Sequence, residues 1–145
     1  MMLRSEPKRA VLLIAPQVPP YGGMALQAQQ LQRLLNGEGV AAVLVASNPP
    51  FPPWARFLER VRGLRALLRE VVFCAKLWQA LPQADVVHIL ACSWLYFFFI
   101  VYPSVAISRL RDRRVILNYR GGEAQRFFRW FGWAAKPVFR LRPPR

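Results

Sequence analysis

The spacing of apolar residues divides the chain into alternating strands and helices. Residues 10–15 form a short apolar run that ends at Pro16, which predicts a strand buried on both faces of a parallel sheet. Between residues 24 and 35 the apolar positions recur at intervals of three and four, the period of an amphipathic helix. A second apolar run at residues 40–46 completes a β-α-β unit, for which we expect a right-handed crossover.

The same alternation continues through the rest of the chain. Residues 54–81 have a long helical pattern with a break near Gly63. The later segments are a strand at 85–90, an apolar helix at 94–110, a strand at 115–118 and the start of a helix at 124–133. The pattern predicts an α/β fold, a Rossmann-like, doubly wound parallel sheet of about four strands. We expect one domain over residues 1–135 and a basic, proline-rich tail over 136–145.

The composition excludes a disordered chain and shows a strong positive net charge. The chain has 145 residues, of which 54% are hydrophobic, enough for one domain with a core. Its net charge of +14 predicts an anionic partner, namely a nucleic acid, an anionic lipid surface or a phosphorylated substrate. Cys74 and Cys92 lack metal-binding or redox spacing and are expected to be reduced core residues, which fits a cytoplasmic protein.

The uncharged stretch at residues 86–108 has two interpretations. It contains no Asp, Glu, Lys or Arg and is long enough to span a bilayer. A strand, a turn with Ser93 as a helix N-cap and a buried helix explain the same residues. Pro103 and the serines of this stretch favour the second interpretation. The first interpretation remains the alternative prediction: a small basic membrane protein with one spanning helix at about 86–108.

Two glycine pairs, each between a strand and a helix, mark the candidate binding site. Such a pair lets the backbone approach a ligand and the helix N-terminus behind it favours an anion, although a tight turn has the same pattern. In a doubly wound sheet both loops lie at the carboxyl ends of strands, where ligands bind. The candidate residues are Gly22, Gly23 and Met24 in the first loop, and Arg120, Gly121, Gly122 and Glu123 in the second.

Two further features each allow a functional and a structural interpretation. Residues 54–81 combine an apolar stripe with many arginines, as in a helix that lies on an anionic membrane or in an ordinary surface helix. His88 is the only histidine, and its apolar strand favours a hydrogen-bonded core residue over a catalyst.

Taken in order, four segments resemble the N-terminal half of a family 4 glycosyltransferase of the GT-B fold. They are the first strand with PPYGGMALQAQQL, then VAAVLVASNPPFP, then DVVHIL after Pro82, and finally RRVILNYRGGEA, and they span about residues 10–131. The resemblance implies a retaining enzyme that transfers a sugar from a nucleotide sugar to a glycan or lipid-linked acceptor. It implies no metal and no cofactor other than the nucleotide sugar as co-substrate.

The resemblance also implies roles for the two loops, although no residue receives a catalytic role. Gly22 and Gly23, with Met24 beside them, would approach the donor diphosphate. Many relatives have a histidine where Arg120 stands, and an arginine cannot act as a base but can bind a phosphate or carboxylate. Glu123 is expected to bind sugar hydroxyls or to interact favourably with the helix dipole.

The donor-binding C-terminal domain of that family, with its pair of glutamates, has no counterpart in these residues. We therefore expect an acceptor-side half that has little activity alone, as a truncated product, a fragment or one subunit of a split enzyme. Relatives with lipid-linked acceptors are peripheral membrane proteins, so the expected location is the cytoplasm or the cytoplasmic membrane face. A nucleic-acid-binding module is the least favoured alternative, because the arginines are spread along helices.

Overall fold

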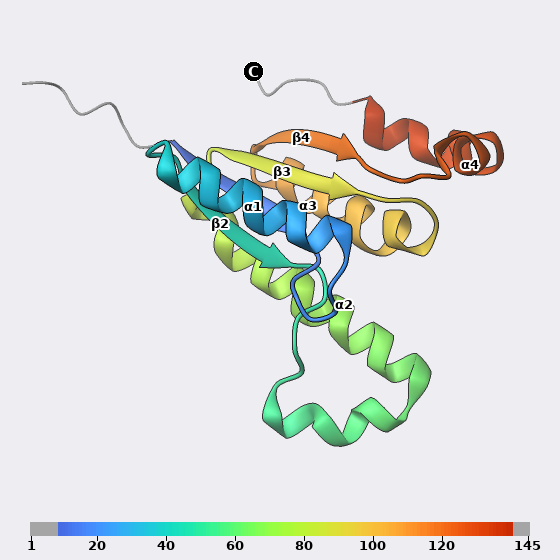
Figure 1. Cartoon of the computed structure of the whole chain (residues 1–145). Coiled ribbons are helices and arrows are strands. Elements are labelled where there is room, and N and C mark those ends of the chain that lie inside the picture. The colour runs from blue at the N-terminus through green and yellow to red at the C-terminus, as the bar shows by residue number, and fades with distance from the viewer. Residues whose placement is uncertain (1–8, 141–145) are drawn as a thin grey trace, which may run out of the picture.

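The computed structural model describes residues 9–140 and confirms the predicted Rossmann-like α/β fold (Figure 1). Four parallel strands form one sheet in the order β2-β1-β3-β4. The strands are β1 (Ala10–Ala15), β2 (Ala41–Ala46), β3 (Val86–Ala91) and β4 (Arg114–Tyr119). The α-helices are α1 (Gly23–Gly37), α2 (Arg62–Ala80), α3 (Tyr102–Leu110) and α4 (Ala124–Phe139).

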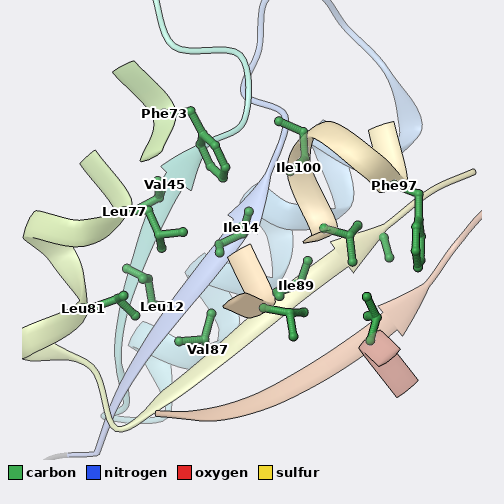
Figure 2. Close-up of a cluster of buried hydrophobic side chains, with 14 of the residues drawn as sticks. Leu12, Ile14, Val45, Phe73, Leu77, Leu81, Val87, Ile89, Phe97 and Ile100 are labelled. Atoms are coloured by element: carbon green, nitrogen blue, oxygen red, sulfur yellow. The ribbon is translucent and has the colours of Figure 1, made fainter. Parts of the chain in front are cut away.

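The main core lies on the face of the sheet that α2 and α3 cover. Alternate side chains of the strands point into it, including Leu12 and Ile14 of β1 and Ile89 of β3 (Figure 2). Phe73 of α2 and Phe97 next to α3 are completely buried against them. Full burial of one such side chain stabilises the fold by about 1.5–3 kcal/mol.

The opposite face has a smaller core beneath α1. Ala28 of α1 packs with Ala15 and Leu90, and Met24 and Leu44 are partly buried against this cluster. Because α1 packs on β1 and β2, the β3–β4 side of this face is more open. Ile116 of β4 is 52% exposed there, next to its strand partner His88.

The helical pattern at residues 54–81 forms two elements separated at Val61. The 3-10 helix η1 (Pro53–Arg60) begins at a proline, and α2 begins after Val61, whose backbone is extended. This confirms the predicted break near Gly63. Most of the apolar stripe of this segment does not face the core, because Trp54, Phe57 and Val61 are more than half exposed.

The uncharged stretch at residues 86–108 divides into a strand and a helix. After β3 comes a π-helical turn, η3 (Phe97–Val101), which leads into α3. Pro103 lacks the N–H that would bond the Phe99 carbonyl in a regular α-helix, and the wider π turn precedes it. Within residues 9–140 there is no helix with both the length and the apolar character needed to cross a membrane.

The boundary of the predicted basic tail needs correction. Helix α4 continues through Pro137 to Phe139, so residues 136–139 are helical rather than part of a tail. Val138 is buried in the main core, and the ring of Phe139 stacks on Phe97 with centroids 6.2 Å apart. This packing offsets the hydrogen bond that a proline removes from a helix. Residues 141–145 lie outside the described residues.

Candidate functional site

The strand order places the candidate site at the carboxyl edge of the sheet, between β1 and β3. The chain leaves β1 toward α1 on one face of the sheet and leaves β3 toward α3 on the other. Neighbouring loops therefore diverge, and open α/β sheets bind ligands in the crevice that such a divergence creates. Both glycine loops lie at this edge, because they follow β1 and β4 (Figure 1).

The first loop is held in place by Asn48, which follows β2. The Asn48 side-chain oxygen accepts a hydrogen bond from the Gln17 backbone N–H at 2.7 Å. Its amide nitrogen donates to the carbonyls of Gln17 at 2.9 Å and Pro19 at 3.3 Å. One side chain thus satisfies three backbone groups of the loop, which orders the approach to Gly22 and Gly23.

Gly22 and Gly23 are both exposed at the start of α1. Gly22 is the N-cap with an extended backbone (φ −143°), and a Cβ added to either glycine would meet no atom within 4 Å. The fold itself therefore does not require glycine at these positions. No side chain caps α1 and its first turn has no acidic residue, so the free N–H groups of this turn lack these two usual partners. Met24 instead packs inward, against the smaller core.

Gly121 in the second loop is needed for a close contact. A Cβ at this position would lie 2.7 Å from the hydroxyl oxygens of Ser93 and Tyr119, which hydrogen bond to each other. Any larger residue would displace this pair. Gly122 has no such restriction, because its Cβ would meet nothing within 4 Å.

Trp94 and Glu123 join the loop after β3 to the loop after β4. The Trp94 indole N–H donates to the Glu123 carboxylate at 2.9 Å, and Glu123 is the N-cap residue of α4. Trp94 has a φ of 62°, a conformation that non-glycine residues rarely adopt. The prediction of Ser93 as a helix N-cap is wrong, because its hydroxyl is buried against Tyr119 instead.

Arg120 lies on the more open face of the sheet, near His88. Its backbone N–H donates to the Ala91 carbonyl at 2.8 Å and its side chain is exposed. Burial lowers the pKa of His88, and the positive charge of Arg120 lowers this pKa further. The expected hydrogen bond of His88 is not found, because its buried Nε2 atom has no partner among the described residues.

A hollow of about 660 Å³ beside the first loop was not predicted from the sequence. Tyr96 lines it and donates a hydrogen bond from its hydroxyl to Ser47 Oγ at 3.3 Å. Burial raises the pKa of Tyr96 to about 12. Arg69 also lines the hollow and adds a positive charge, with its guanidinium 5.0 Å from the centre of the Phe51 ring. The sequence feature that could have indicated this hollow is the pair of proline-rich loops around residues 16–20 and 47–50.

The second loop lines a different hollow. This hollow has a volume of about 770 Å³ and extends along the start of α4, from Gly122 to Trp130. The first hollow includes Pro20 but no residue of the second loop, and the second hollow includes no residue of the first loop. The two glycine loops thus share one edge of the sheet, and neither of these two hollows connects them.

The chemistry available at this edge favours the binding of anions. Glu123 is the only carboxylate in the loops that follow the four strands, and it is engaged by Trp94. Arg69 and Arg120 supply positive charge. No cluster of three His, Cys, Asp or Glu side chains that could hold a metal ion occurs within the described part of the chain. No family model, curated protein or solved structure matches this sequence.

Proposed function

We propose that this chain supplies the acceptor-side domain of a retaining, nucleotide-sugar-dependent glycosyltransferase. The observation that carries the proposal is the pair Gly22 and Gly23 at the uncapped start of α1, at the carboxyl edge of the sheet. The fold requires neither glycine, whereas a ligand that approaches the backbone closely would require residues without a side chain. Ligand binding therefore explains why glycine occurs at these two positions. The free amides of the helix start suit the diphosphate of a sugar donor.

The remaining chemistry supports a binding role more than a complete catalytic one. Arg120 is permanently charged and suits a phosphate or carboxylate, whereas it cannot accept a proton as a base. Glu123 is held by Trp94, which reduces its freedom to take part in chemistry. We therefore expect these residues to form one wall of the active site and the isolated chain to have little or no transferase activity.

The proposed acceptor is a glycan or a lipid-linked molecule at an anionic membrane surface. Support comes from the outer side of η1 and α2. Phe73 and Leu77 of α2 are buried in the core, whereas other apolar side chains of the two helices are exposed. Trp54 is 71% exposed and Phe57 is 68% exposed, and exposed arginines at 56, 60, 62 and 65 lie among them. An ordinary surface helix would bury its apolar stripe, whereas an interfacial helix presents it to the lipid.

Calorimetric titration with uridine, guanosine and adenosine diphosphate sugars tests the proposal. We expect at least one of them to bind the full chain, and Gly22→Leu and Gly23→Leu to reduce that affinity tenfold or more, as an order of magnitude. Gly63→Leu is the matched control, because a Cβ at Gly63 also meets nothing within 4 Å. Equal binding by all three variants, or no binding of any sugar nucleotide to the wild-type chain, would contradict the proposal.

A further inference from the structure

The outer face of α4 carries aromatic and basic side chains that the core does not use. Trp130 is 67% exposed and Trp133 is 75% exposed. Positively charged residues lie three or four positions from them, on the same side of the helix. We call this group the α4 stripe, and it consists of Arg126, Arg129, Trp130, Trp133 and Lys136 together with Arg140, the C-cap residue that follows the helix. No Asp or Glu occurs between residues 124 and 140.

The opposite face of α4 is firmly attached to the domain. Phe127, Ala135 and Val138 are buried in the main core. The Tyr102 hydroxyl donates to the Ala134 carbonyl, and Arg109 Nη2 donates to the Pro137 carbonyl at 3.1 Å. Since these contacts fix the rotation of the helix, the α4 stripe cannot turn inward to bury its tryptophans.

A hollow lies at the N-terminal end of the stripe. It is the hollow of about 770 Å³ described above, and Arg126, Arg129 and Trp130 contribute to its wall together with Glu123, whose carboxylate accepts the hydrogen bond from Trp94. The two guanidinium groups can bind a phosphate ester, and the indole ring beside them offers an apolar surface next to that phosphate.

We propose that the α4 stripe binds the surface of an anionic lipid bilayer. Tryptophan prefers the boundary between headgroups and acyl chains, because its ring is apolar and its N–H is polar. Basic residues near an anionic bilayer each strengthen binding about fivefold. The absence of acidic side chains between residues 124 and 140 gives this surface the charge that complements such a bilayer.

This surface is separate from the one formed by η1 and α2. Helix η1 follows β2 and α4 follows β4, and these are the two edge strands of the sheet. Figure 1 shows both elements at the carboxyl side of the sheet, beyond the ends of its strand arrows. The loop at Gly22 follows the central strand β1, between the two edge strands, and the loop at Arg120 leads directly from β4 into α4. The α4 inference does not depend on the transferase proposal.

Co-sedimentation of the full chain with lipid vesicles tests the inference. The vesicles contain phosphatidylcholine alone or phosphatidylcholine mixed with phosphatidylglycerol. We expect the wild-type chain to bind the mixed vesicles, with an affinity that falls as salt is added. Trp130→Ser/Trp133→Ser and Arg129→Gln/Lys136→Gln should each weaken this binding about tenfold or more. Both pairs are exposed, and circular dichroism should show unchanged helix content and thermal unfolding.

Two control variants make the result specific to α4. Arg33→Gln/Leu34→Ser changes an exposed basic residue and an exposed apolar residue of α1 and should bind like the wild type. Trp54→Ser/Phe57→Ser alters the surface formed by η1 and α2, so its result bears on that surface alone. Wild-type binding by both α4 variants would overturn the inference. So would a wild-type dimer that the tryptophan variant dissociates without any change in vesicle binding, because the stripe would then bind a second copy.

Discussion

The indole N–H of Trp94 lies 2.9 Å from the carboxylate of Glu123 and joins two loops that are 29 residues apart. Behind this contact, the hydroxyls of Ser93 and Tyr119 form a second connection between the same loops. Trp94 also packs edge-on against Phe127 and Phe131 of α4. The start of α4 is therefore positioned by the loop after β3 as well as by its own strand.

Gly121 should be the sensitive glycine of the second loop. Gly121→Ala places a Cβ 2.7 Å from two hydroxyl oxygens, and we expect a loss of about 1–3 kcal/mol in the free energy of unfolding. Gly122→Ala is the matched control and should change that free energy by no more than about 0.5 kcal/mol, because nothing lies within 4 Å. Urea unfolding measures both values. Equal effects of the two substitutions would show that the Ser93–Tyr119 contact does not restrict this loop.

Two phenylalanines in one π-helical turn should differ strongly in their effect on stability. Phe97 is completely buried, and Phe97→Ala should reduce the free energy of unfolding by about 3–5 kcal/mol. Phe99 is 55% exposed, so Phe99→Ala should cost about 1 kcal/mol or less. Thermal unfolding followed by circular dichroism gives the comparison. Similar losses would mean that the turn presents its side chains differently from the arrangement described.

His88 should lose its proton at a lower pH in the folded chain than in the unfolded chain. The ordinary pKa of a histidine is 6.5. As the pH falls below this value, His88 takes up its proton in the unfolded chain before it does so in the folded chain, so protonation favours unfolding. The contribution of His88 to stability is thus fully present above pH 6.5 and decreases toward its lower folded pKa. Urea unfolding across this range, compared with His88→Gln, isolates the effect.

Proton NMR gives a direct control for this titration, because His88 is the only histidine. Its pKa should lie below 6.5 in the wild-type chain and should rise in Arg120→Gln, which removes the nearby positive charge. A pKa at or above 6.5 in the folded wild-type chain would contradict the described surroundings of the imidazole.

Cys74 should react slowly with alkylating reagents. Burial and the neighbouring Glu70 carboxylate raise the pKa of its thiol from 9.0 to about 11, which lowers the thiolate fraction about a hundredfold. In a Cys92→Ser background, iodoacetamide labelling at about pH 8 should therefore be about a hundredfold slower in the folded chain than in urea. Adding Glu70→Gln should speed the folded reaction. Equal rates with and without urea would disprove the shielding of this thiol.

The strands and the two glycine loops could be predicted because local patterns determine them. Runs of about six apolar residues bounded by Pro or Gly identified β1 and β2, and alternation with helices gave the parallel sheet. The helical extent of α4 could not be predicted from local pattern. Pro137 suggests an earlier end, and only the burial of Val138 in the core and the stacking of Phe139 on Phe97 explain why the helix continues.

The contacts that shape the candidate site could not be predicted from the sequence either. Asn48 and Gln17 are 31 residues apart, and no spacing rule indicates that one side chain would hold the other residue's backbone. The hollow lined by Tyr96 depends on two loops, on α2 and on the helical segment after β3, which meet only in the folded chain. Equally, the difference between Gly121, which the fold requires, and Gly22, which it does not, appears only from the neighbouring atoms.

The most direct measurement of the central claim is the mapping of nucleotide-sugar binding by NMR. Amide signals of the ¹⁵N-labelled full chain are followed during titration with the sugar nucleotide that binds most tightly. We predict the largest shifts at Gly22, Gly23 and Met24, at the start of α1, and further shifts at Arg120–Glu123. No saturable shift, or shifts confined to the opposite edge of the sheet around Asp85 and Asp112, would contradict the assignment of a sugar-nucleotide site to this edge.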